Sequence, residues 1–175
     1  ARTNLFNETG IKDRMASSMA STERRTEPLT VAYIDLRGFK MVNDTIDHAA
    51  GDAVLLFVGE FLKMQTRAGD TVGRLGGDEF VLCFENATLA QIQERFNDDV
   101  LTNQLAEYIR RRMIENGIDP KQTHVTGRMG LSQREQGDSV SSLMKKGDLQ
   151  VNQKRDAEIA AGTYIREQTN TTTNG

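Results

Sequence analysis

Cysteine and histidine are scarce in this sequence, and their scarcity excludes several kinds of chemistry. Among 175 residues there is one cysteine, Cys83, and there are two histidines, His48 and His124. A single cysteine cannot form an intramolecular disulfide or a cysteine-based zinc site. Two histidines argue against a multi-histidine metal centre. Any metal or acid–base chemistry is therefore expected to use carboxylates, and an intracellular protein is favoured.

Long apolar runs and a strong charge of either sign are also missing. No apolar stretch approaches the ~20 residues that a membrane-spanning helix needs, so we expect no membrane contact by this chain. The net charge of −3, from 22 basic and 25 acidic residues, argues against a nucleic-acid polymer as partner. With 37% hydrophobic and 27% charged residues, the chain has the composition of one ordinary globular domain. Phosphate binding would then depend on a local site.

Hydrophobic periodicity divides the chain into interspersed helices and strands. The run from Leu29 to Ile34 is apolar and ends at Asp35, which predicts a buried strand with a carboxylate at its exit. Residues 75–80 predict the turn of a hairpin. We expect helices at 9–25, 39–46, 49–64, 89–116 and 139–161, and strands from 71, at 80–84, at 124–131 and at 162–165. This order predicts an α/β fold with one sheet flanked by helices.

Three acidic residues occupy positions that a fold of this kind can bring together. Asp35 ends the first strand, and Asp78 and Glu79 lie at the hairpin tip after Gly76 and Gly77. Converging carboxylates are held together most readily by a hard divalent cation such as Mg²⁺, which also binds phosphates. The two glycines can adopt positive φ and leave room for a ligand against the backbone. Alone, the same residues would also suit an ordinary solvated turn.

The hairpin string and four other segments match one family in order and near-family spacing. Residues 76–80 read GGDEF, and the other segments are 9–14 (TGIKDR), 35–44 (DLRGFKMVND), 48–52 (HAAGD) and 67–70 (RAGD). Over residues 9 to 160 the chain resembles the GGDEF domain of diguanylate cyclases, which condense two GTP into cyclic di-GMP. The resemblance implies an antiparallel-containing sheet of the ferredoxin-like, palm-type nucleotide cyclase fold.

The resemblance also implies the domain boundaries and the setting of the chain. It implies a GGDEF domain over residues 1–168, with an N-terminal helix (1–25) and a catalytic core (29–166). A Thr- and Asn-rich tail (169–175) is expected to be disordered. Because the chain begins at Ala1 and lacks a signal-peptide pattern, we expect the cytoplasmic output domain of a longer signalling protein.

The metal ligands and the catalytic groups are implied by similarity. Asp35, Asp78 and the Leu36 carbonyl would bind Mg²⁺ or Mn²⁺, two ions per active site. Glu79 would assist the attack of the 3′-hydroxyl by metal contact or as a general base, or would merely orient the loop. Lys40 would neutralise phosphate charge during the reaction.

The substrate contacts follow in the same way. Asn43 and Asp52 would read the guanine edge, since a carboxylate can accept from both N1–H and N2–H₂. Their alternative roles are a helix cap and a first-turn acid, respectively. Phosphates would lie on the backbone amides of Gly38 and Phe39. The remaining contacts would come from Lys40, Lys154, Gly76 and Gly77.

A second ligand site is implied by Arg67 and Asp70, which match the family's RxxD inhibitory site for cyclic di-GMP. Arg67 would grip a phosphate and a guanine, and Asp70 would hold a guanine. The alternative is an ion pair between the two residues at the surface. Arg74, just before the hairpin glycines, is a further candidate phosphate contact.

Four residues depart from the family pattern. Arg37 replaces the second acid of the D-x-D segment, Arg128 stands at a usual serine and Val151 at a usual tyrosine. Glu158 replaces a phosphate-binding arginine, a reversal of charge for which the neighbouring Arg155 could compensate. These departures leave two main interpretations open: an active homodimeric diguanylate cyclase with product inhibition, or a degenerate module that binds GTP or cyclic di-GMP and regulates a partner. A cyclase making a different nucleotide is a third interpretation, which Asp52 disfavours because it retains the guanine-reading acid.

Overall fold

The chain folds around a four-stranded sheet in the computed structural model, which describes residues 5–121 and 123–163. In chain order the elements are α1 (Glu8–Arg25), β1 (Leu29–Arg37), α2 (Phe39–Thr45), α3 (His48–Met64), β2 (Thr71–Gly76), β3 (Glu79–Glu85), α4 (Leu89–Arg95), the π-helical turn η1 (Val100–Gln104), α5 (Leu105–Glu115), β4 (Thr126–Gln133) and α6 (Val140–Ala160). From β1 onward the order is strand, helices, two strands, helices and strand, as in ferredoxin-like folds. The expected strand at 162–165 lies partly outside the described residues, and the tail at 169–175 lies wholly outside them.

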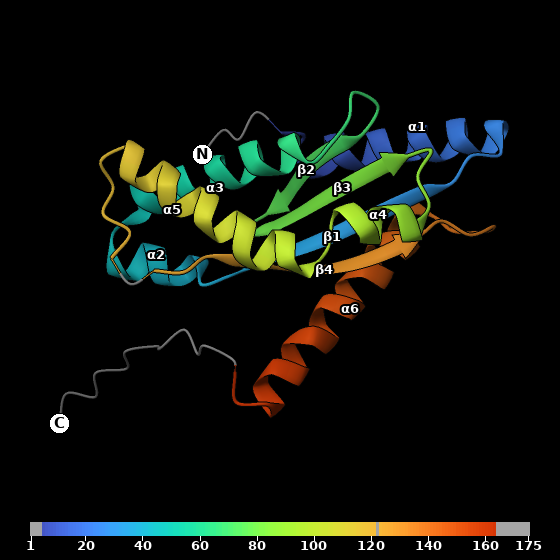
Figure 1. The fold of residues 1–175 in the computed structure, drawn as a ribbon. Helices are drawn as coiled ribbons and strands as arrows, with labels where there is room; N and C mark the ends of the chain where they lie inside the picture. Colours follow the sequence, from blue (N-terminus) through green and yellow to red (C-terminus); the bar gives the residue numbers. More distant parts are fainter. Residues whose placement is uncertain (1–4, 122, 164–175) are drawn as a thin grey trace.

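The strands lie in the order β2-β3-β1-β4, and every neighbouring pair is antiparallel. Figure 1 shows these arrows side by side, with α6 (orange to red) running obliquely away from β4. Strand β1 is central, so Asp35 faces Glu79 of β3 on one side and Arg128 of β4 on the other. The predicted α/β sheet flanked by helices is confirmed, and β1 carries residues of the candidate site at its end.

The alternation of side chains along the strands builds two separate apolar layers. Ala32, Ile34 and Leu36 point to the layer formed with α3 and α5. Val31 and Tyr33 point to the opposite layer, where α1 and α6 pack. Because successive strand residues face opposite sides, a run that is apolar throughout covers both faces of a sheet. This burial explains why residues 29–34 show no polar alternation.

The stretch 89–116 is mostly helical, as predicted, but it is not one continuous helix, because the chain leaves the helix after Arg95. Phe96 takes extended angles (φ −131°, ψ 91°) and is buried, with its ring 6.0 Å from that of Phe84. Asn97 Oδ1 then accepts hydrogen bonds from the backbone N–H groups of Asp99 and Val100. Short polar side chains compete with helical hydrogen bonding in this way. The interruption separates α4 from the continuous helical stretch formed by η1 and α5.

Helix α6 approaches the sheet through two glycines that face each other. A Cβ built on Gly130 of β4 would lie 2.1 Å from the Gly147 carbonyl oxygen, and one built on Gly147 would lie 2.6 Å from Tyr33 Cβ. The close approach brings the later turns of α6 over the end of β1. Within the described part of the chain, none of the helices combines the length and apolar character needed to span a bilayer.

Candidate active site

Two of the predicted acids meet where β1 ends beside the hairpin. The backbone N–H of Leu36 donates to the carbonyl of Asp78 at 3.2 Å, which ties the hairpin tip to the strand. Asp35 and Asp78 both line a cavity of about 240 Å³. Its wall is completed by Leu36, Arg37, Gly38, Thr102, His124, Thr126, Arg128 and Arg155. The cavity therefore combines two carboxylates with three guanidinium groups.

Asp35 has an altered acidity in this setting. Its pKa is raised to about 6, first by burial and then by the negative charge of Asp78, while Arg128 acts in the opposite direction. A raised carboxylate pKa means that the folded chain holds this proton more tightly than an unfolded chain does. Two acids that repel each other at a cavity wall favour a cation between or beside them.

Glu79 does not join this pair, so the expected convergence of three carboxylates is reduced to two. The Tyr33 hydroxyl donates to Glu79 Oε1 at 2.7 Å, and both residues line a different cavity between α1 and α6. Across residues 5–121 and 123–163, no group of three or more His, Cys, Asp or Glu side chains is placed to hold a metal. Nothing in the sequence pattern indicated Tyr33 as the partner of Glu79.

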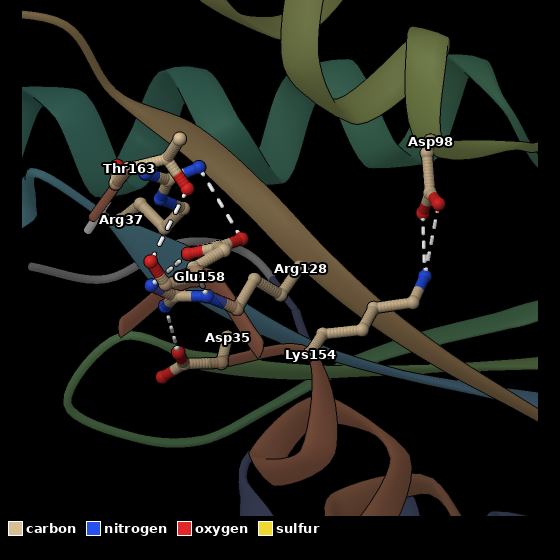
Figure 2. A network of polar contacts seen from close by, with 7 residues as sticks. All are labelled: Asp35, Arg37, Asp98, Arg128, Lys154, Glu158 and Thr163. Atoms are coloured by element: carbon tan, nitrogen blue, oxygen red, sulfur yellow. Dashed lines mark hydrogen bonds and ion pairs between the residues drawn. The ribbon is translucent and has the colours of Figure 1, made fainter. Parts of the chain in front are cut away.

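Three of the four departures from the family pattern contact one another at the cavity, as Figure 2 shows. Arg128 Nη1 donates to Asp35 Oδ2 at 3.1 Å, and Arg128 Nε and Nη2 donate to Glu158 Oε2 at 3.0 and 2.8 Å. Arg37 Nη1 donates to Glu158 Oε1 at 3.3 Å and Arg37 Nη2 to the carbonyl of Thr163. The negative charge of Glu158 is thus met by two arginines. The fourth departure, Val151, is a buried core residue of α6.

Lys154 and Arg155 differ in where they point. Lys154 Nζ lies 2.7 Å from Asp98 Oδ1, at the side of Figure 2 away from Asp35, and Lys154 is absent from the cavity wall. Arg155 lies in that wall. Lys154 would therefore have to leave Asp98 to make the predicted phosphate contact, whereas Arg155 already lines the cavity.

The strand-to-helix turn after β1 depends on a glycine. Gly38 has φ +75°, and a Cβ there would lie 2.3 Å from the His124 carbonyl oxygen. Only glycine tolerates this combination of left-handed backbone and close approach. Phe39 then begins α2, and Lys40 is exposed on its first turn.

The two predicted guanine contacts lie at the junction of α2 and α3. Asn43 Oδ1 occupies the place where a Cβ on Gly51 would be, 1.9 Å away, so this amide packs directly on α3 beside Asp52. Asn43 lies within α2, and the N-cap of α3 is Asp47, whose side chain accepts from Ala50 N at 2.7 Å. Asp52 lies beyond the first turn of α3. The alternative roles of Asn43 as a helix cap and of Asp52 as a first-turn acid therefore find no support.

The hairpin glycines and Arg74 form a local structure of their own. Gly77 has φ +49°, whereas Gly76 does not adopt positive φ, which corrects the expectation for Gly76. A Cβ on either glycine would meet nothing within 4 Å, so space for a ligand remains. Arg74 Nε and Nη2 donate to the Gly77 carbonyl at 2.9 and 2.6 Å. In this structure Arg74 braces the hairpin.

Arg67 and Asp70 lie together beside another cavity, but their contacts differ from a simple surface pair. Asp70 Oδ2 accepts from the backbone N–H of Arg67 at 2.9 Å and lies 3.5 Å from Arg95 Nη2. The Asp70 side chain is 4% exposed, while Arg67 is exposed. Arg67 is thus available to an external anion, and Asp70 already has partners.

Comparison with known proteins identifies the family to which this arrangement belongs. The family described as diguanylate cyclase, GGDEF domain, matches residues 1–159. Diguanylate cyclase A of Treponema denticola is 34% identical over 131 residues, covering 73% of this chain and 33% of that protein. The bifunctional diguanylate cyclase/cyclic di-GMP phosphodiesterase MucR of Pseudomonas aeruginosa is 42% identical over 83 residues, covering 47% of this chain and 12% of that protein.

A solved structure agrees with this match. The active GGEEF domain of a diguanylate cyclase from Vibrio cholerae has a TM-score of 0.67 and 27% identity, covering 87% of this chain and 92% of that chain. The chain spans a third or less of the two curated relatives, at 33% and 12% of their lengths. The family match includes the strand end, the hairpin and the helix pair described above, and the chain belongs to the GGDEF domain family.

Proposed function

We propose that this domain is a diguanylate cyclase that condenses two GTP molecules into cyclic di-GMP and pyrophosphate. The observation that carries the proposal is the cavity where Asp35 and Asp78 face three arginines. Carboxylate oxygens suit a hard divalent ion, and guanidinium groups suit the phosphates of a nucleotide. Catalysis of phosphoryl-type transfer needs mainly such positioning and charge stabilisation.

The residues present fit a divalent metal. Mg²⁺ commonly binds one or two carboxylates while it keeps waters and phosphate oxygens. Burial, and then the charge of Asp78, raise the pKa of Asp35, and a cation would relieve the repulsion between the two acids. Asp35, Asp78 and the Leu36 carbonyl would hold Mg²⁺ or Mn²⁺, two ions per active site. When bound, the ions would neutralise phosphate charge and polarise the α-phosphate.

The remaining residues would bind and orient the substrate. Asn43 and Asp52 would read guanine at the junction of α2 and α3, and the Gly38–Phe39 turn with Lys40 would receive phosphates. Glu79 would act on the 3′-hydroxyl after leaving Tyr33. Since one domain holds one GTP, two copies of the chain would face each other as a homodimer.

A second candidate function is supported by the charges at the cavity. Arg128 already contacts Asp35, and Glu158 stands where the resemblance implies an arginine. These contacts favour a degenerate module that binds GTP or cyclic di-GMP and regulates an attached or partner protein. The acids Asp35 and Asp78 and the Asn43–Gly51 packing favour the enzyme.

A product assay with concurrent mass measurement separates the two functions. The protein, freed of bound nucleotide, would be incubated with GTP and Mg²⁺ or Mn²⁺, and the products resolved by chromatography. We expect cyclic di-GMP from the natural sequence and none from Asp78→Ala, with a folded dimer in both. A dimeric preparation that binds GTP but yields no cyclic di-GMP would overturn the enzyme and support the module.

A further inference from the structure

Arg128 is placed by the sheet directly beside the acid that the proposed function assigns to the metal. It lies on β4 in register with Asp35 of β1, so both side chains leave the same face of the sheet. Nη1 of Arg128 is 3.1 Å from Asp35 Oδ2, and the arginine side chain is only 6% exposed. An arginine so deeply placed cannot simply swing into water when a metal arrives.

Glu158 binds the other end of the same guanidinium group. Its Oε2 accepts from Nε and Nη2 of Arg128 at 3.0 and 2.8 Å, and its Oε1 accepts from Arg37 (Figure 2). Two N–H groups that donate to one carboxylate oxygen hold the guanidinium plane in one orientation. Glu158 therefore determines that Nη1 of Arg128 points toward Asp35.

We propose that Arg128, oriented by Glu158, is an internal counter-cation of Asp35 that sets how readily this domain takes up a divalent ion. The inference rests on the proposed role of Asp35 as a metal ligand. A metal at Asp35 must either displace the Arg128 contact or tolerate a positive charge next to it, and both weaken metal binding. Glu158 lowers this cost, because Arg128 keeps a partner when Asp35 turns to the metal.

Two members of the network should consequently change metal affinity in opposite directions. Arg128→Ser removes the competing cation and should tighten Mn²⁺ binding by about tenfold. Glu158→Gln removes the negative charge that competes with Asp35 for Arg128 and should weaken binding by about threefold, because the attraction of Arg128 to Asp35 is then less opposed. If Arg128 and Glu158 acted only in folding, the two substitutions would not change Mn²⁺ affinity in opposite directions.

The measurement uses Mn²⁺ itself and needs no turnover. Free Mn²⁺ is followed by its electron paramagnetic resonance signal during titration of the intact chain without nucleotide, with folding checked by circular dichroism. Arg155→Ser is the matched control, since it removes a guanidinium group from the same cavity wall. It should change affinity by less than about threefold, because Arg155 acts on Asp35 through its charge, whereas Arg128 also donates a hydrogen bond to Asp35.

The Asp35→Asn background separates the inference from the proposed function. If Asp35→Asn leaves Mn²⁺ binding unchanged, the metal assignment of the proposed function fails. If Asp35→Asn abolishes binding while Arg128→Ser matches the natural sequence, or Arg155→Ser has the same effect as Arg128→Ser, only the counter-cation inference is overturned. Should Arg128→Ser fail to fold, Glu158→Gln decides alone: Glu158 is 23% exposed at its side chain, and unchanged or tighter binding would refute the inference.

Discussion

The Tyr33 hydroxyl donates a 2.7 Å hydrogen bond to Glu79 across the pair of strands that forms the centre of the sheet. Burial raises the pKa of Tyr33 well above its usual range, and the hydrogen bond and charge of Glu79 act in the same direction. The phenol therefore keeps its proton and remains a donor throughout the neutral range. The contact explains why the second acid of the hairpin faces a different cavity from Asp35 and Asp78.

Removal of this hydroxyl should cost a measurable amount of stability. We expect Tyr33→Phe to lower the free energy of unfolding by about 1 kcal/mol, the net value of a hydrogen bond to a partly buried acceptor. Urea denaturation of both proteins measures the difference. The control is Tyr108→Phe. The Tyr108 hydroxyl donates to the exposed Glu60, so its removal should lower the free energy of unfolding by less. Equal losses in the two variants would argue against a special role for the Tyr33 contact.

The close contact between α6 and β4 should make Gly130 intolerant of any side chain. A Cβ there would lie 2.1 Å from the backbone oxygen of Gly147, and backbone cannot move aside as a flexible side chain can. We expect Gly130→Ala to destabilise the fold by about 2–3 kcal/mol, as overpacking does. Gly69→Ala is the control.

That control should have the opposite sign. Gly69 has no neighbour within 4 Å of an added Cβ and no positive φ, so alanine there should stabilise by up to about 1 kcal/mol by restricting the unfolded chain. The midpoints of urea unfolding, compared at equal dependence of the unfolding free energy on urea concentration, give both changes in stability. A Gly130→Ala protein as stable as the natural sequence would show that α6 does not pack on β4 as described.

The buried thiol should make stability fall at high pH. Burial raises the pKa of Cys83 from 9.0 to about 12, with the charge of Glu85 adding to the effect. Because the folded chain holds this proton more tightly than the unfolded chain, the stabilisation is complete below pH 9 and is lost as the pH rises toward 12. Urea unfolding of the natural sequence should therefore weaken more steeply above pH 9 than that of Cys83→Ala. Parallel pH profiles would contradict the burial of the thiol.

Arg67 should govern product inhibition through the cyclic di-GMP site that the RxxD motif predicts. Arg67→Ala removes an exposed guanidinium group, so the inhibition constant for cyclic di-GMP should rise by about tenfold or more while turnover is retained. Initial rates at several concentrations of cyclic di-GMP measure the constant. The exposed Arg111, on α5, provides Arg111→Ala as a control that should leave it unchanged. An unaltered constant for Arg67→Ala would remove the site from consideration.

Local patterns in the sequence sufficed for most elements and for the two acids at the cavity. The apolar run that ends at Asp35, and the glycine pair before Asp78, are short-range signals whose meaning does not depend on distant residues. The helix interruption was also local, since Asn97 carries the competing hydrogen bonds, but the apolar spacing of residues 89–116 obscured it. The tertiary contact that accompanies the interruption, the packing of Phe96 on Phe84, cannot be seen in the sequence.

The sequence by itself determined where the strands, helices and family motifs lie, because periodicity, turn residues and motif spacing act over short distances. Only the tertiary structure decided which charges meet. Arg128 reaches Asp35 across 93 positions, and Arg37 reaches Glu158 across 121. Such pairs depend on strand register and on the glycine contact that sets the course of α6. Three of the four residues that depart from the family pattern therefore form one connected network.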